Sequence, residues 1–175
     1  MSPVTPISRE GLTEVRATDP GRIARQWGSR VHRPLLGDDG RLLLVAADHP
    51  ARGALGVRAD PMAMASRTDL LERLAVALAR PGVDGVLGTA DIVDDLLLMG
   101  ALDGKVVIGS MNRGGLQGAT FELDDRFTGY TAAEIAARGL DGGKMLTRVA
   151  LNDCGTVATL EASARAVSDL GAYGL

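Results

Sequence analysis

Two residues in this sequence have side chains suited to proton transfer and amine chemistry, and each stands beside an apolar run. Asp48 ends the run 41–47, and Lys144 begins the segment 144–149. If that segment is a strand, alternation puts Lys144 and Arg148 on one face, and helices should cover the more apolar opposite face. Burial of a lysine is costly unless its amine is paired or used. Because a carboxylate at the end of the first run can be held close to such a lysine, we expect Lys144 to point inward, toward Asp48.

Both residues also have an ordinary structural interpretation. The strand could begin later, which would leave Lys144 in the solvated turn formed with residues 141–143. Asp48 could serve as a helix cap or turn residue ahead of Pro50. The pattern alone leaves these alternatives open.

Polar residues near the ends of the predicted strands could bind a substrate. His49 could shuttle protons, although a histidine next to a proline is also commonly a loop hydrogen-bonder. The segment 112–115, Asn-Arg-Gly-Gly, is typical of a turn whose backbone amides face a phosphate or carboxylate. The predicted substrate-binding residues are His49, Asn112, Arg113 and Arg148. Arg52, Asp91 and Ser110 also stand at strand ends, and we assign them no role.

The sequence offers little for a metal ion or a nucleotide cofactor. His32 and His49 are its only histidines, so a site with several histidine ligands is not available. The turn after the first predicted strand, 47–53, carries a proline and charged groups where a dinucleotide-binding sheet would have Gly-x-Gly-x-x-Gly. We therefore predict no metal and no cofactor.

The composition is that of a globular protein with an aliphatic core. Of the 175 residues, 46% are hydrophobic and 3% are aromatic, and the formal net charge is −3. The chain has neither a block rich in Lys and Arg nor an apolar run of about 18 residues, so we expect no nucleic-acid or membrane partner. One cysteine, Cys154, excludes an internal disulfide, and the first ten residues lack the features of a secretory signal. These features predict a cytoplasmic protein.

Short apolar runs alternate with helical patterns along most of the chain. The predicted strands are 41–47, 83–87, 106–108 and 144–149, and the predicted helices are 67–80, 90–102, 131–138 and 156–170. Strands with nearly unbroken apolar character are typical of a parallel sheet covered by helices. The alternation predicts an α/β fold, either an open sheet or a (β/α)8 barrel. Residues 1–40 carry weaker helical patterns and form an N-terminal extension to a domain spanning 41–175.

Three stretches resemble a known enzyme family. Residues 45–55, 109–118 and 142–148 are similar to the bacterial class I aldolases that form (β/α)8 barrels, the group of deoxyribose-phosphate, tagatose-bisphosphate and archaeal-type fructose-bisphosphate aldolases. The nearest subgroup is deoxyribose-phosphate aldolase-like and is found beside inositol-catabolism genes. The resemblance implies that Asp48 and Lys144 are catalytic. Asp48 would assist proton transfer and orient the lysines, and Lys144 would lower the pKa of the imine-forming lysine.

The resemblance also implies a truncated barrel. Family members continue through eight strands and place the imine-forming lysine on the sixth, whereas 41–175 holds about four βα units, the N-terminal half. The expected function is a Schiff-base lyase that reversibly cleaves a carbon–carbon bond in a small sugar-phosphate or keto substrate, incomplete or inactive as this chain alone. The alternative is a non-catalytic half-barrel that works by dimerisation or by pairing with another chain. A third interpretation is a regulatory domain that binds a phosphorylated ligand near 112–115. We expect a homo-oligomer.

Overall fold

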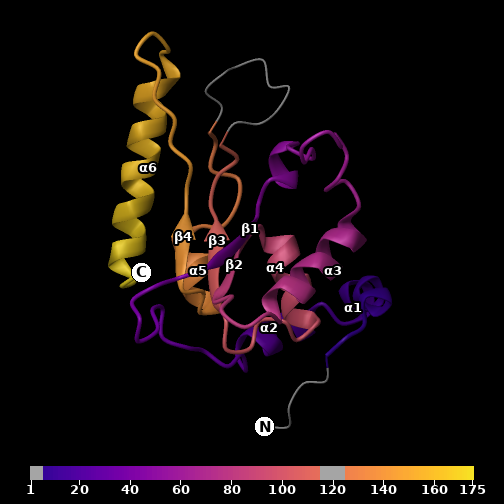
Figure 1. Ribbon diagram of the computed structural model, residues 1–175. Coiled ribbons are helices and arrows are strands. Elements are labelled where there is room, and N and C mark those ends of the chain that lie inside the picture. The colour runs from indigo at the N-terminus through magenta and orange to yellow at the C-terminus, as the bar shows by residue number, and fades with distance from the viewer. Residues whose placement is uncertain (1–5, 115–124) are drawn as a thin grey trace.

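The computed structural model describes residues 6–114 and 125–175, and these ranges form one α/β architecture (Figure 1). The strands are β1 (Leu44–Ala47), β2 (Gly85–Gly88), β3 (Val106–Ser110) and β4 (Gly142–Lys144). The α-helices are α1 (Leu12–Thr18), α2 (Gly21–Trp27), α3 (Arg67–Leu78), α4 (Ala90–Leu98), α5 (Ala132–Arg138) and α6 (Gly155–Ala172). Two short 3-10 helices, η1 (Arg9–Gly11) and η2 (Pro50–Arg52), complete the list.

The four strands form a single parallel sheet in the order β1-β2-β3-β4. Each pair of neighbouring strands is joined through a helical crossover, which a parallel connection requires. The α/β class predicted from the alternating pattern is therefore confirmed, and each predicted helical segment overlaps a helix.

The prediction of a truncated (β/α)8 barrel was wrong. In the described residues the sheet has four strands, with β1 at one edge and β4 at the other. Alternating strands and helices are common to open sheets and barrels, since both are built from the same crossover unit. Closure is a long-range property of strand pairing, and the local pattern of apolar residues does not encode it.

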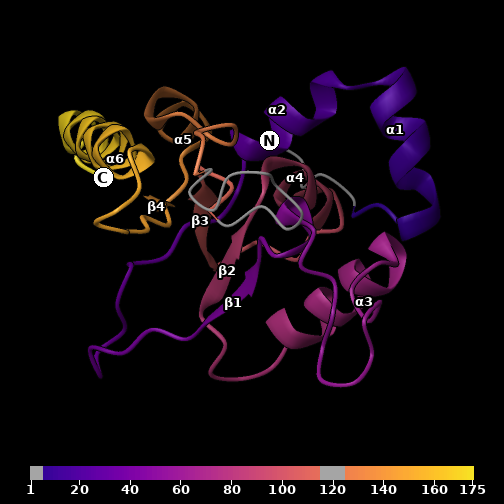
Figure 2. The same cartoon turned by 90° about the horizontal axis from the view of Figure 1, so that it is seen from above.

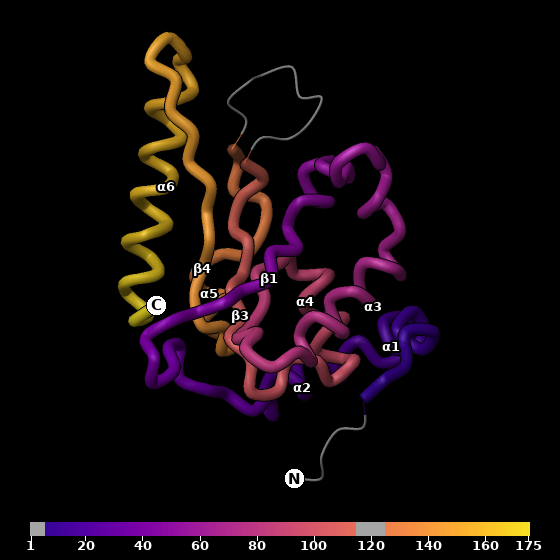
Figure 3. The backbone as a smooth tube through the Cα atoms, viewed as in Figure 1, coloured from indigo at the N-terminus to yellow at the C-terminus, as the bar shows by residue number. Residues whose placement is uncertain are grey.

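The strand β4 is shorter and earlier than the predicted strand 144–149. It ends at Lys144, and the chain continues as an extended segment beyond the sheet before α6 runs back beside it (Figure 3). Gly143 explains the position of β4, because a Cβ there would lie 2.6 Å from Met111 Sδ and 3.0 Å from Ile135 Cδ1. Glycine permits β4 to approach its neighbours closely, and this places Lys144 at the carboxyl end of the sheet.

The helices α3 to α6 lie along one side of the sheet (Figure 2). Side chains on that side, such as Val86 and Val107, are completely buried and belong to the main hydrophobic core. The other side of the sheet carries Ala46, Leu87 and Ile108, which are exposed or half-buried. Since side chains alternate along a strand, Asp48, Ser110 and Lys144 project on this second side, where no described helix covers them.

The N-terminal helices pack against the rest of the molecule. Leu12 of α1 and Trp27 of α2 are buried and belong to the same hydrophobic cluster as the sheet. The helix α2 contacts α4, and Arg30 beyond it donates to the carbonyls of Lys105 and Gly139. These contacts attach the predicted extension to the helical layer.

Candidate functional site

The centre of the candidate site is an ion pair between the two residues expected to face each other. Lys144 Nζ donates to Asp48 Oδ2 at 2.6 Å, across 96 positions of sequence. Asp48 follows β1 and Lys144 ends β4, and the carboxyl ends of parallel strands meet at one edge of the sheet. The Asp48 side chain is 7% exposed, whereas that of Lys144 is 31% exposed. The carboxylate is thus fixed in the interior, and the amine remains reachable from solvent.

Two further side chains approach the same carboxylate. Ser110 Oγ donates to Asp48 Oδ2 at 3.3 Å, and His49 Nδ1 lies 3.7 Å from Asp48 Oδ1. Ser110 is opposite Lys144 in the β3–β4 register, and both point to the second side of the sheet. The sequence placed Ser110 at a strand end without a role, because the register that aligns it with Lys144 depends on pairing between distant segments.

The environment of Asp48 favours its ionised form. Burial by itself would raise the pKa of this carboxyl. The hydrogen bond and charge of Lys144, together with the charge of His49 and a backbone hydrogen bond, outweigh burial and leave the pKa of Asp48 below its ordinary value. Asp48 is therefore a stable counter-ion for an ammonium and a weak proton acceptor.

A cavity of about 240 Å³ opens beside Asp48 at the carboxyl ends of β1, β2 and β3. Its lining residues are Asp48, Ala51, Arg52, Thr89, Ala90, Asp91, Ser110, Asn112, Arg113, Thr128 and Gly129. Arg52 and Arg113 are its two cationic residues, and within the described parts of the chain neither guanidinium makes an ion pair. The cavity thus has two carboxylates on its wall, Asp48 and Asp91, and two guanidinium groups that make no ion pair with the described residues.

Asn112 and Arg148, both predicted to bind substrate, make intramolecular contacts in the structure. Asn112 Nδ2 donates to the carbonyl oxygens of Leu146 and Asp125 at 2.8 and 3.2 Å, and its Oδ1 accepts from the Leu146 amide at 2.9 Å. Arg148 Nε donates to Asp125 Oδ1 at 2.8 Å. These contacts hold the segment after β4 against the loop after β3. Substrate binding by either residue stays a prediction.

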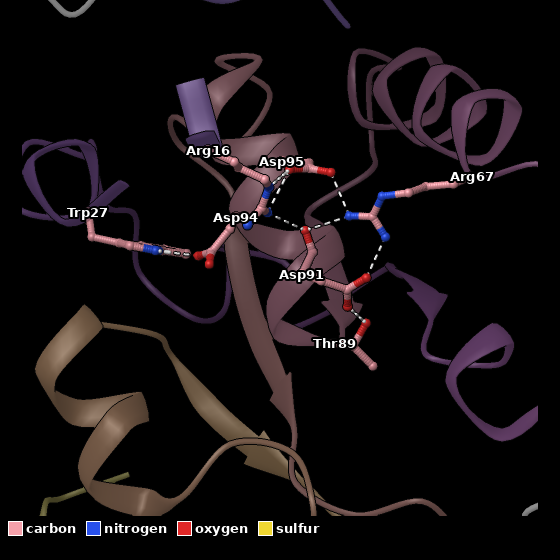
Figure 4. Close-up of polar contacts among 7 residues, drawn as sticks. All are labelled: Arg16, Trp27, Arg67, Thr89, Asp91, Asp94 and Asp95. Atoms are coloured by element: carbon pink, nitrogen blue, oxygen red, sulfur yellow. Dashed lines mark hydrogen bonds and ion pairs between the residues drawn. The ribbon is translucent and has the colours of Figure 1, made fainter. Parts of the chain in front are cut away.

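A network of hydrogen bonds between carboxylates and arginines lies on α4 beside the cavity (Figure 4). Thr89 Oγ1 donates to Asp91 Oδ1 at 2.6 Å, and Arg67 contacts both Asp91 and Asp95. Asp95 also accepts from Arg16 Nε at 2.8 Å, so one buried carboxylate joins α1, α3 and α4. Although burial opposes it, the pKa of Asp91 lies below its ordinary value because of the contacts from Thr89 and Arg67. These contacts were not predicted from the sequence, because Arg16 and Arg67 lie far along the chain from the carboxylates of α4.

Neither a metal site nor a membrane-spanning helix is found within the ranges 6–114 and 125–175. No group of three or more His, Cys, Asp or Glu residues is arranged there to hold a metal ion. None of the helices in those ranges combines the length and the apolar character that crossing a membrane requires.

Comparison with known proteins gives a family and a solved structure. The model of a family described as Cgl0159-like matches residues 40–175. The crystal structure of Cgl0159 from Corynebacterium glutamicum (Brevibacterium flavum) is 56% identical and superposes with a TM-score of 0.93. The match covers 98% of this chain and 58% of that one, so this chain spans little more than half the length of its neighbour. No curated protein matches the chain.

These matches correct the family assignment made from the three sequence stretches. The expected resemblance to class I aldolases, including the inositol-associated subgroup, was wrong, because nothing in the matches points to an aldolase family. Short motifs at strand ends, such as a carboxylate followed by histidine and proline, can occur in unrelated α/β proteins. The family model covers more than three-quarters of the sequence, and it shows that the chain belongs to the Cgl0159-like family.

Proposed function

We propose that this chain binds a small carbonyl compound with an anionic group and that Lys144 forms an imine with it, leading to reversible carbon–carbon cleavage. The observation that carries the proposal is the 2.6 Å contact between Lys144 Nζ and Asp48 Oδ2 at the carboxyl end of the sheet. A partly exposed amine paired with a buried carboxylate has both a nucleophile and a proton acceptor within reach of one substrate. Asp48 also lines the cavity, which connects the pair to a binding space.

The reaction begins when the Lys144 ammonium loses a proton and its Nζ adds to the carbonyl carbon. Loss of water, which carries away the carbonyl oxygen, gives a protonated imine. The bond between the neighbouring carbon and the next, hydroxyl-bearing carbon then breaks, and its electron pair forms an enamine while the hydroxyl proton passes to Asp48. The departing fragment leaves as an aldehyde. Protonation of the enamine carbon and hydrolysis of the imine release the second product and restore the amine.

The cavity favours a compact substrate with a negative charge. Its volume of about 240 Å³ lies below the lower end of ligand pockets, which is roughly 300 Å³. Arg52 and Arg113 line it without ion pairs in the described residues, and an arginine binds carboxylate or phosphate through two parallel hydrogen bonds. These features support a short carboxylated or phosphorylated carbonyl compound.

The ion pair also limits the rate. A carboxylate with a lowered pKa stabilises the ammonium and accepts a proton poorly, so both addition and cleavage are slowed. We therefore expect imine formation to be slow, so that trapping needs a long incubation, and turnover by this chain alone to be weak.

Borohydride trapping tests the proposal directly. The protein is incubated with dihydroxyacetone phosphate, or separately with acetaldehyde, and then reduced with borohydride, which converts an imine into a stable secondary amine. Peptide mass spectrometry should locate the adduct on Lys144. Because Lys105 and Lys144 are the only lysines, Lys105→Arg is a matched control for Lys144→Arg. Lys105 lies at the other end of the sheet, where its Nζ donates to the Val83 carbonyl at 2.7 Å.

We expect Lys105→Arg to keep the adduct and Lys144→Arg to lose it. Trapping on Lys105 or on the N-terminal amine, with none on Lys144, would contradict the proposal. So would equal trapping in wild type and in Lys144→Arg.

A second candidate function is pairing with another copy of this chain. It is favoured by the side of the sheet that no described helix covers, where Ala46 is exposed and Leu87 and Ile108 are half-buried. The edge strands β1 and β4, which have no further strand beside them in the described residues, add backbone donors and acceptors to this surface.

A further inference from the structure

A second cavity lies in the helical layer, away from the candidate site. It has a volume of about 690 Å³ and is formed by α2, α4 and α5. The residues that line it are Pro20, Ile23, Ala24, Trp27, Gly28, His32, Asp94, Ala136, Ala137, Arg138 and Gly139. None of them lines the cavity beside Asp48. The two cavities are therefore separate binding spaces.

The wall of this cavity contains a buried carboxylate that makes no ion pair with the described residues. Asp94 is 8% exposed, and its Oδ1 accepts from Trp27 Nε1 at 2.8 Å (Figure 4). Within the described residues, no other hydrogen bond and no ion pair reach this carboxyl. Burial raises the pKa of Asp94, although the hydrogen bond from Trp27 and the charges of Arg138 and Arg16 oppose that effect. A buried carboxylate with one neutral donor is poorly compensated.

The neighbouring residue in the helix shows how the fold compensates a carboxylate that has only a structural role. Asp95 is also buried, with 3% of its surface exposed, but it receives hydrogen bonds from both Arg16 and Arg67. Asp94 lies on the same helix and is also buried, but none of the described arginines donates a hydrogen bond to it (Figure 4). Both residues line cavities, of about 690 Å³ at Asp94 and about 350 Å³ at Asp95, but only Asp94 has a carboxylate oxygen that receives no hydrogen bond from the described residues.

A cationic residue, Arg138, lines the same cavity. Arg138 is half-buried in the last turn of α5, and its guanidinium lies 5.6 Å from the centre of the Tyr130 ring. It makes no ion pair with any described residue. Ile23, Trp27 and Ala136 line the same cavity and supply apolar surface.

We propose that this cavity binds a small zwitterion, with its amino group on Asp94, its acid group on Arg138 and its apolar body against Trp27. The amino group supplies the charge-assisted partner that the second carboxylate oxygen lacks. The acid group does the same for the guanidinium, which can hold it with two parallel hydrogen bonds. An α-amino acid with an unbranched apolar side chain has this arrangement of groups.

The fluorescence of Trp27 can report ligand binding, because Trp27 is the only tryptophan in the chain and it lines the cavity. Its fluorescence is titrated with norleucine, and in parallel with hexanoate and pentylamine. Hexanoate lacks the amino group of norleucine, and pentylamine lacks its acid group. We expect norleucine to change the emission with saturation, and each partial analogue to bind at least about tenfold more weakly, as loss of one charged hydrogen bond predicts.

Two variants test which side chain binds the amino group of norleucine and which binds its acid group. Asp94→Asn keeps the shape of the side chain and Arg138→Gln shortens an accessible one, and each should weaken norleucine at least about tenfold. Asp169→Asn, on the exposed surface of α6, is the matched control and should bind as wild type does. If Asp94→Asn fails to fold by circular dichroism, Arg138→Gln alone decides.

The proposal is overturned if norleucine leaves Trp27 emission unchanged, if hexanoate or pentylamine binds as tightly, or if a folded variant at either position binds like wild type. Lys144→Arg should bind norleucine normally. The outcome is therefore independent of the imine chemistry proposed for Asp48 and Lys144.

Discussion

At the scale of single residues, the pair formed by Asp48 and Lys144 dominates the candidate site. The carboxylate is buried and the amine is about one-third exposed. Removal of the lysine would leave an uncompensated charge in the interior, whereas protonation of the aspartate would relieve that cost. The contribution of the pair to stability should therefore depend on pH.

The direction of this pH dependence follows from the lowered pKa of Asp48. A carboxyl whose pKa is lower in the folded protein adds stability above its unfolded pKa, and this is lost as pH falls through the folded value. We expect Lys144→Met to cost about 1–2 kcal/mol at neutral pH, discounted for the exposure of the amine. The cost should shrink in acid, where Asp48 is protonated. Urea unfolding of wild type and variant at both pH values measures this.

The matched control is Arg165→Met, which removes an exposed pair with Glu161 on α6 at 3.8 Å. It should cost no more than about 0.5 kcal/mol, because exposed pairs spaced four residues apart on a helix contribute little. A cost for Lys144→Met that stayed the same from neutral to acid pH would be inconsistent with the charge pairing.

At the scale of elements, side-chain hydrogen bonds hold the segment after β4, where a strand would be held by backbone hydrogen bonds to its neighbour. Asn112 uses both its carbonyl and its amide group on Leu146, and Arg148 pairs with the buried Asp125. Such contacts replace the backbone pairing that the predicted strand 144–149 would have had. Asn112 therefore acts as a bridge between the loop after β3 and the segment that follows Lys144.

Replacement of Asn112 by alanine should release this segment. Loss of the bonds to buried backbone groups costs about 1–3 kcal/mol, and the Leu146 amide should exchange with deuterium faster. Asn112→Asp separates the two roles, because it keeps the acceptor for that amide but turns a charged oxygen toward the carbonyls of Leu146 and Asp125; it should cost stability while the Leu146 amide stays better protected than in Asn112→Ala. Exchange at Leu146 that is equally slow in wild type and in Asn112→Ala would exclude the bridging role.

At the scale of the whole molecule, the sheet has helices on one side and a partly apolar surface on the other. A parallel sheet is ordinarily covered on both faces. If a second copy covers the open side, sedimentation should show a dimer across the micromolar range. Ala46→Glu, which puts a charge on the open side, should shift the protein to monomer.

Val76→Glu is the matched control for this association, since Val76 is an exposed apolar residue of α3 on the helical side. It should leave the dimer intact. A folded wild-type protein that sediments as a monomer throughout that range would exclude pairing between copies.

The sequence by itself determined the order and type of the elements, because apolar periodicity and caps such as Ser66 before α3 act between near neighbours. It also indicated that Lys144 would turn toward Asp48, since burying an unpaired amine is costly. The tertiary structure decided the rest: the end of β4, the four-stranded sheet in place of a truncated barrel, and the arrival of Ser110, Arg52 and Asp91 at one cavity. These features depend on pairing and packing between segments far apart in the chain, and local patterns do not carry that information.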